Sequence, residues 1–254
     1  MHTPLSAAQI AQFHRDGYLV FRALATPPDC ETMLDVVRAH LREEVGPVEY
    51  EADLGYAGAP PSRGAPGGRT IRRLRDAYQR HACFRAWAED ARVVGWLQQL
   101  FGEAVVLTLA HHNCLMTKHP HFGTATGWHR DIRYWSFSRN DLVAVWLALG
   151  VESADNGALH VIPGSHRLDI GRDQLDELDF LRPDAERNQP LFEEGRVLAL
   201  QQGDVVFFHS GLFHAAGRNA TDKVKHSAVF AYRAASNPPL PGSRSAAAGE
   251  VALG

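Results

Sequence analysis

A histidine and an aspartate separated by one residue are the most informative feature of this sequence. His129 and Asp131 lie in the segment Gly-Trp-His-Arg-Asp of residues 127–131. In an extended strand, residues i and i+2 point to the same side, so both side chains can reach one metal ion. A distant second histidine would complete a set of two histidines and one carboxylate, which leaves positions open on iron(II). The sequence therefore predicts half of a metal site at this point.

Two histidines in a later apolar segment are candidates for the missing ligand. His209 ends the run Val-Val-Phe-Phe, and His214 follows it after Ser-Gly-Leu-Phe. Three other histidines have weaker claims. His166 follows a Pro-Gly-Ser turn and is expected to be structural, whereas His111 and His112 are adjacent, so only one of them is expected to face a cavity.

Length and composition indicate an ordinary globular protein. The chain has 254 residues, of which 45% are hydrophobic and 22% charged, and its formal net charge is −3. This charge gives no reason to expect nucleic acid or an anionic membrane as a partner. The three cysteines form no Cys-X-X-Cys pair, and we expect a reducing, cytoplasmic location. No secretory signal or membrane-spanning run is recognised, so no membrane partner is expected.

The apolar pattern changes from helical to strand-like along the chain. Helices are predicted over 7–16, where Ser6 and Gln9 have capping-box spacing, and over 29–44 and 84–101. Short strands bounded by Gly, Pro, Asn or Asp are predicted over 18–21, 105–109, 112–118, 142–149, 158–162, 196–200, 204–209 and 226–233. Helices first and strands afterwards favour a β-sandwich or barrel that N-terminal helices brace.

Two segments lack a regular pattern and are expected to contact the substrate or cover it. Residues 52–70 are rich in glycine and proline, and residues 166–195 form a charged insertion with short helical pieces. An arginine cluster follows the first segment and is either a solvated basic face or a contact for an anionic substrate; its members are Arg69, Arg72, Arg73 and Arg75.

Three motifs in this order resemble those of the phytanoyl-CoA dioxygenase family of iron(II)- and 2-oxoglutarate-dependent oxygenases. They are the His-X-Asp pair, the Val-Ile-Pro-Gly-Ser-His run of residues 161–166, and His214 with Asn219 behind it. The resemblance begins at the N-terminal helix and residues 16–18 and runs to about residue 232, so it covers most of the chain. It implies a mainly β fold, a double-stranded β-helix (jelly roll, cupin-like) braced by N-terminal α-helices.

The resemblance also implies a domain organisation. A single oxygenase domain is expected over 1–235, with the N-terminal helices in 1–104 and the jelly-roll core in 105–235. Residues 236–254, which are rich in Pro, Gly, Ala and Ser, are expected to form a flexible tail.

The resemblance assigns a role to each candidate side chain. His129, Asp131 and His214 match the three catalytic metal ligands, which places His214 ahead of His209. The family's co-substrate, 2-oxoglutarate, chelates the iron, and a basic residue eleven positions after the last ligand holds its distal carboxylate. That residue is Lys225 here instead of the usual arginine. Lysine is a point charge without the bidentate fork of arginine.

Further co-substrate contacts follow from the same resemblance. Trp146 matches a position that borders the co-substrate, and Lys118 matches a position near the entrance of the site. Arg233 is an alternative source of positive charge to Lys225. Ala216 stands where the family often has a serine hydroxyl.

The implied activity is that of an iron(II)- and 2-oxoglutarate-dependent dioxygenase. It would use O2 to hydroxylate a small-molecule substrate, with formation of succinate and CO2. The carboxylate of Asp131 favours hydroxylation, or a related oxidation, over halogenation, because related halogenases have a small residue at that position. The alternative is a non-catalytic jelly-roll protein that binds a metal or small ligand. Neither the substrate nor the oligomeric state follows from the sequence.

Overall fold

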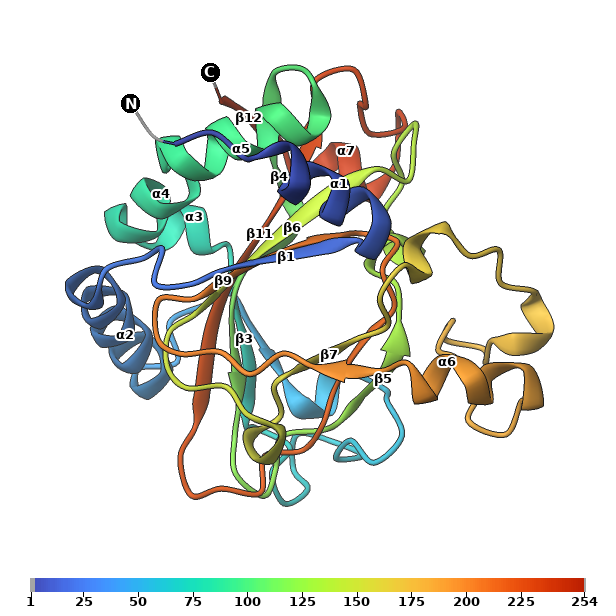
Figure 1. Cartoon of the computed structure of the whole chain (residues 1–254). Helices are drawn as coiled ribbons and strands as arrows, with labels where there is room; N and C mark the ends of the chain where they lie inside the picture. Colours follow the sequence, from blue (N-terminus) through green and yellow to red (C-terminus); the bar gives the residue numbers. More distant parts are fainter. Residues whose placement is uncertain (1–2, 254) are drawn as a thin grey trace.

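The structure is a computed structural model that describes residues 3–253, and Figure 1 shows its helices and strands. The helices are α1 (Ala7–Asp16), α2 (Pro27–Arg42), α3 (Ala77–Arg80), α4 (Ala82–Ala88), α5 (Ala91–Phe101), α6 (Gln189–Glu193) and α7 (Arg244–Ala247). The strands are β1 (Tyr18–Phe21), β2 (Val48–Tyr50), β3 (Ile71–Arg75), β4 (Val105–Lys118), β5 (Thr126–His129), β6 (Leu142–Ala148), β7 (Leu159–Val161), β8 (Arg196–Val197), β9 (Val205–His209), β10 (His214–Ala216), β11 (Lys225–Ala234) and β12 (Glu250–Leu253).

These strands form two antiparallel sheets. The larger has the order β1-β9-β6-β11-β4-β3-β2, with β12 paired to the first part of β4, and the smaller has the order β5-β10-β7-β8. The N-terminal helices α2 to α5 lie together on the side of the large sheet that faces away from the small one (Figure 1). The predicted jelly roll with bracing helices is confirmed by this arrangement and by the structural relatives described below.

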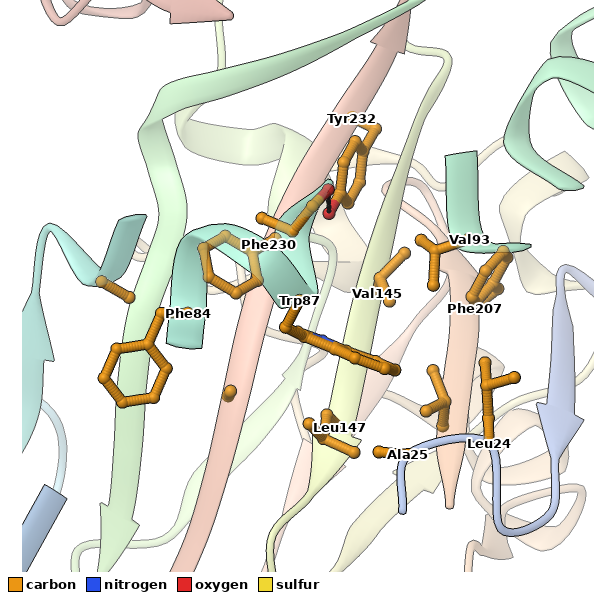
Figure 2. Close-up of a cluster of buried hydrophobic side chains, with 14 of the residues drawn as sticks. Leu24, Ala25, Phe84, Trp87, Val93, Val145, Leu147, Phe207, Phe230 and Tyr232 are labelled. Carbon is orange, nitrogen blue, oxygen red and sulfur yellow. Dashed lines mark hydrogen bonds between the residues drawn. The ribbon is translucent and has the colours of Figure 1, made fainter. Parts of the chain in front are cut away.

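Side chains of the central strands point alternately to the two faces of the large sheet, and this forms two apolar layers. On β6, Val143, Val145 and Leu147 pack against the helices, whereas Ala144 and Trp146 point into the space between the two sheets. This follows from the two-residue period of a strand. Figure 2 shows the helix-side layer, in which aromatic side chains of β9 and β11 pack on residues of α4 and α5. The inner layer lies between the sheets, where the candidate site residues are also found.

The N-terminal helix is fixed as its sequence predicts. The backbone N–H of Gln9 donates to Ser6 Oγ (3.2 Å), and the Ser6 N–H donates to Gln9 Oε1 (2.9 Å). Gly17 ends the helix with φ +81°. A Cβ there would lie 2.5 Å from Nδ1 of His166, so glycine also permits close packing against that turn.

Three element predictions differ from the structure. The helix expected over 84–101 is two helices, α4 and α5, because the side chain of Asp90 accepts the N–H groups of Arg92 and Val93 and starts a new helix. The strands expected over 105–109 and 112–118 are one strand, β4, whose pairing with β11 shifts opposite Phe230 and Ala231. The expected flexible tail instead contains α7 and β12, since Glu250–Leu253 pairs with Val105–Thr108.

The insertion 166–195 packs against Trp128 of β5, and the glycine-rich segment contacts the insertion through Tyr56 and Phe180. Arg72 belongs to the cluster expected either to form a solvated basic face or to contact an anionic substrate. It is 2% exposed, which excludes the solvated face for this residue, and it pairs with Glu51 and donates to Thr126 Oγ1 on β5 (2.6 Å). The hydrogen bond from Arg72 to Thr126 connects β3, the strand after the glycine-rich segment, to the small sheet. The insertion 166–195 contains α6 and short 3₁₀ turns, as predicted. None of the helices within residues 3–253 is long and apolar enough to cross a membrane.

Candidate metal centre

The two histidines of the candidate site face each other across paired strands of the small sheet. His129 ends β5 and His214 begins β10, and the two residues are Cα partners in the antiparallel register. Directly opposite side chains in such a pair project to the same face. Their ring centroids are 4.2 Å apart. Hydrogen bonding between β5 and β10 therefore brings together two residues that are far apart in the sequence.

Asp131 joins them from just beyond the strand. β5 ends at His129, and Asp131 begins a 3₁₀ turn, so the prediction that both lie within one strand is wrong. However, Arg130 keeps extended dihedrals (φ −106°, ψ 138°), which preserves the same-side relation of its two neighbours. The Arg130 guanidinium points away and donates to the carbonyls of Ser165 and Leu168.

The three candidate ligand atoms have the spacing of a metal site. Asp131 Oδ1 lies 3.9 Å from Nε2 of His129 and 3.6 Å from Nε2 of His214. One atom from each residue lies within 4.8 Å of the others. Atoms that sit about 2 Å from a common first-row metal ion are separated by roughly 3 to 4 Å, so an ion fits between them.

Both histidines are oriented for metal binding. Nδ1 of His129 donates to the carbonyl of Gly127 (2.8 Å), and Nδ1 of His214 donates to the carbonyl of Leu212 (3.1 Å). These bonds fix the tautomer with an unprotonated Nε2 that points at Asp131. Burial, helped by the neighbouring His214, holds the pKa of His129 well below its ordinary value, and burial also lowers the pKa of His214. Both rings are therefore neutral at pH 7, the form that binds a metal.

His112 holds the remaining oxygen of the carboxylate. Its Nε2 lies 2.8 Å from Asp131 Oδ2, which leaves Oδ1 directed at the two histidines. Burial disfavours the imidazolium of His112, but the Asp131 carboxylate outweighs it and raises the pKa to about 9. Burial likewise opposes ionisation of Asp131, yet His112 and His214 lower its pKa overall. An ordered carboxylate with one free oxygen is the expected state of a metal ligand.

A cavity of about 270 Å³ opens beside the candidate ligands and is rich in arginine. His129 and Asp131 line it together with four arginines, Arg73, Arg75, Arg133 and Arg244. Arg73 pairs with Glu49 (3.2 Å), whereas Arg75 and Arg244 take part in no ion pair among residues 3–253. Tyr134 and Trp135 also line the cavity, one exposed and the other buried.

Lys225 and Trp146 meet at a buried carboxylate that was not predicted. Lys225 Nζ lies 3.1 Å from Oε2 of Glu152, and Trp146 Nε1 donates to Oε1 of the same residue (2.9 Å). Ser227 Oγ donates to Oε1 as well (2.6 Å). We call these four residues, Trp146, Glu152, Lys225 and Ser227, the Lys225 cluster. None of them lines the arginine-rich cavity.

The two other basic candidates are bound elsewhere. Arg233 makes two 2.6 Å contacts with the carboxylate of Glu250 on β12, so the suggestion that it supplies charge in place of Lys225 is wrong. Lys118 is 5% exposed and donates to the carbonyl of Thr124 (2.8 Å), so it lies in the interior and not at an entrance. Burial, with nearby Arg72 and Lys225, lowers the pKa of Lys118 to about 6.

The rival histidines lie apart from the three ligand atoms. His209 Nε2 faces Asp141 (3.5 Å), and its Nδ1 accepts the N–H of Gly211 (2.9 Å). The ring of His166 lies 5.0 Å from that of His209, in the turn that follows Gly164. Neither belongs to the group formed by His129, Asp131 and His214.

Two important residues, Glu152 and Ser227, were not predicted from the sequence, and the choice between His111 and His112 was left open there. His112 alternates with Cys114, Met116 and Lys118 on the inner face of β4, so strand periodicity alone points it inward. Ser227 alternates with Lys225 on β11 in the same way. Glu152 gives no periodic signal, because it lies outside the named strands and makes only an isolated bridge to Leu200.

The fold and the three converging ligand atoms define a jelly-roll protein with a candidate site of two histidines and one carboxylate. Its family follows from the sequence: the model of the family "Phytanoyl-CoA dioxygenase (PhyH)" matches residues 13–227, and the chain belongs to this family. The resemblance seen in the motifs is thereby confirmed.

Two relatives show how far the similarity extends. The human peroxisomal phytanoyl-CoA dioxygenase is 26% identical over 229 residues, which are 85% of this chain and 65% of the human protein. The chain thus spans somewhat less than two thirds of that relative. The ectoine dioxygenase of Sphingopyxis alaskensis is 26% identical over 250 residues, 92% of this chain and 78% of the relative.

Solved structures support the fold. EctD from S. alaskensis, crystallised with 2-oxoglutarate and 5-hydroxyectoine, superposes with a TM-score of 0.74 at 24% identity, over 93% of this chain and 78% of EctD. The α-ketoglutarate-dependent carbocyclase SnoK from nogalamycin biosynthesis has a TM-score of 0.71 at 18% identity, over 94% of this chain and 87% of SnoK.

Proposed function

We propose that the protein is an iron(II)- and 2-oxoglutarate-dependent dioxygenase that hydroxylates a small molecule. The observation that carries the proposal is the convergence of His129 Nε2, His214 Nε2 and Asp131 Oδ1 beside a cavity. This donor set suits iron(II) and leaves positions for other ligands. The family membership, and the 2-oxoglutarate with which EctD was crystallised, support the choice of co-substrate.

Iron(II), when bound with 2-oxoglutarate and O2, supplies the oxidation of a C–H bond with formation of succinate and CO2. The protein contributes orientation. The Gly127 and Leu212 carbonyls hold the two imidazoles, and His112 holds the carboxylate, so the ligand set is formed before the ion arrives. Such preorganisation keeps the reacting groups in a fixed geometry.

The cavity favours an acidic substrate. Arg75 and Arg244 have no carboxylate partner among the described residues, and the Arg133 guanidinium contributes a third positive charge to the same wall. Guanidinium groups bind carboxylate and phosphate oxygens in pairs. We therefore propose a small substrate that carries at least one anionic group, oriented by these arginines with its reacting carbon toward the ligand atoms.

Anaerobic titration tests the proposal. The wild-type protein with iron(II) and 2-oxoglutarate should give a weak visible charge-transfer band, and it should form succinate when air is admitted. His129→Ala and Asp131→Ala should abolish the band. An unchanged band in these variants would refute the ligand assignment.

The Lys225–Glu152 pair favours one alternative function. If a carboxylate of the protein permanently takes the charge of Lys225, the protein binds metal or a small ligand without turnover. That function predicts metal binding without succinate formation under any condition. Succinate from the wild-type protein, even without a substrate, would eliminate it.

A further inference from the structure

The Lys225 cluster is a complete carboxylate-binding site. The Glu152 carboxylate accepts the Trp146 indole N–H and the Ser227 hydroxyl on one oxygen and contacts Lys225 Nζ with the other. The side chains of Lys225 and Glu152 are 5% and 0% exposed. Two neutral donors and one cation satisfy a buried carboxylate well.

The donors come from adjacent strands of the large sheet. Lys225 and Ser227 alternate along β11, and Trp146 lies on the neighbouring strand β6, opposite Val229. Trp146 and Val229 belong to the apolar layer between the two sheets. Phe208 of the same layer packs against the ring of His214, with centroids 5.1 Å apart. The cluster therefore borders the interior layer that backs the candidate metal ligand.

We propose that Glu152 occupies the place of the co-substrate's distal carboxylate and competes with it for Lys225 and Ser227. This inference rests on the proposed function and on the sequence-based expectation that Lys225 holds the distal carboxylate of 2-oxoglutarate. One buried lysine cannot neutralise two carboxylates, because the second would be an uncompensated buried charge. Binding of 2-oxoglutarate at Lys225 therefore requires that Glu152 leave it.

The other basic groups near the cluster are paired, largely neutral or, like Arg218, exposed to solvent. Arg233 is paired with Glu250, and Arg72 is paired with Glu51. Lys118, whose Nζ is bound to the Thr124 carbonyl, is largely neutral at pH 7 with its pKa of about 6. Within residues 3–253, the cluster thus has one cation for one carboxylate.

The competition predicts an unusual choice among 2-oxo acids. Pyruvate has the carboxylate and 2-oxo groups that chelate a metal but lacks the distal carboxylate. It can bind the metal without disturbing Glu152. The wild-type protein should therefore bind 2-oxoglutarate no more than about threefold better than pyruvate, whereas a free anchor would give a preference of tenfold or more.

The experiment measures the affinities of both acids for the manganese(II)-loaded protein by calorimetry. Glu152→Gln keeps the size of the side chain but releases the charge of Lys225, and it should tighten 2-oxoglutarate at least tenfold and pyruvate by less than twofold. Glu51→Gln is the matched control, because Glu51 is also a buried carboxylate with a cationic partner, in its case Arg72. It should leave the ratio of the two affinities unchanged.

The outcomes separate this inference from the proposed function. A wild-type protein that prefers 2-oxoglutarate tenfold or more, or a folded Glu152→Gln variant that does not bind it more tightly, overturns the inference alone. If the variant does not fold, the wild-type preference between the two acids decides the question. If the metal-loaded wild type binds neither acid and forms no succinate, the proposed function and the inference both fail.

Discussion

The candidate metal centre and the Lys225 cluster are both buried and both contain a carboxylate. They differ in how many of the carboxylate oxygens have a hydrogen-bonding partner in the protein. Around Asp131, one carboxylate oxygen and two imidazole Nε2 atoms converge without hydrogen-bonding one another. Around Glu152, both oxygens have short contacts with donors of the protein. Donor atoms that converge beside a cavity without bonding one another indicate a place for a ligand. A cluster whose polar atoms are already hydrogen-bonded indicates that a side chain of the protein fills the position that a ligand would otherwise take.

The largest effect should come from removing a metal ligand. His214→Ala should weaken cobalt(II) binding at least about a thousandfold, equivalent to about 4 kcal/mol, because the site loses one of three protein donors. Calorimetric titration of the apo protein measures this, with circular dichroism as the check on folding. Binding within tenfold of wild type would show that His214 is not a ligand.

The Lys225 cluster should respond in stability instead of metal affinity. Lys225→Met leaves Glu152 buried without a cation, and the free energy of unfolding should fall by about 3 to 5 kcal/mol. The double variant Lys225→Met/Glu152→Gln removes both charges and should recover most of the loss. Urea unfolding measures all three proteins. A loss below about 1 kcal/mol in the single variant would mean that the pair is not a closed, satisfied unit.

A titrating histidine on the other face of β11 adds a pH test. Burial, with the charges of Arg38 and Lys225, lowers the pKa of His226 to about 4. Below pH 6.5 the unfolded chain takes up a proton that the folded protein refuses, so stability falls as the pH drops from 6.5 toward 4.

Replacing this histidine should remove part of that pH dependence. Between pH 7 and pH 4.5, wild type should lose about 2 to 3 kcal/mol more unfolding free energy than His226→Gln. Urea unfolding at the two pH values measures the difference. Equal losses in the two proteins would show that His226 titrates normally in the folded state. As a control, the metal affinity of His226→Gln at pH 7 should equal that of the wild type.

His112 tests whether the second oxygen of Asp131 matters to the metal. His112→Phe removes the partner of Oδ2 and should weaken cobalt(II) binding about 10- to 100-fold, or 1.4 to 2.8 kcal/mol. His111→Phe is the matched control, because His111 contacts Ser245 Oγ (2.7 Å). It should change the affinity by less than about threefold. Equal effects of the two substitutions would contradict the role of His112.

The sequence predicted the metal centre better than its surroundings, for physical reasons. His129, Asp131 and His214 were recognisable because residue type and strand periodicity together specify a face, and the structure brings the three together. Their role as ligands stays a prediction. The Lys225 cluster depends on Glu152, which lies in a loop beside β11. No periodic pattern in the sequence predicts that position.

The fold shows the same division between local and long-range information. Helix α1, with its capping box, was predictable from residues a few positions apart. The break at Asp90 was missed, although its N-cap signal is local, because apolar residues continue on both sides. The pairing of β12 with β4 joins residues more than 140 positions apart, and no short pattern in the small-residue tail indicates it.

The smallest effect is expected for His209, which the sequence offered beside His214 as a candidate for the third metal ligand. His209→Ala should change cobalt(II) affinity by less than about twofold. The His209 ring is held between Asp141 and the Gly211 N–H, and no ligand atom of Asp131 or His129 converges on it. A substitution five residues from His214 that leaves binding intact would assign the thousandfold loss in His214→Ala to the ligand itself. A comparable loss in His209→Ala would instead mean that metal binding rearranges β9 and β10, and the geometry of the apo centre would no longer identify its ligands.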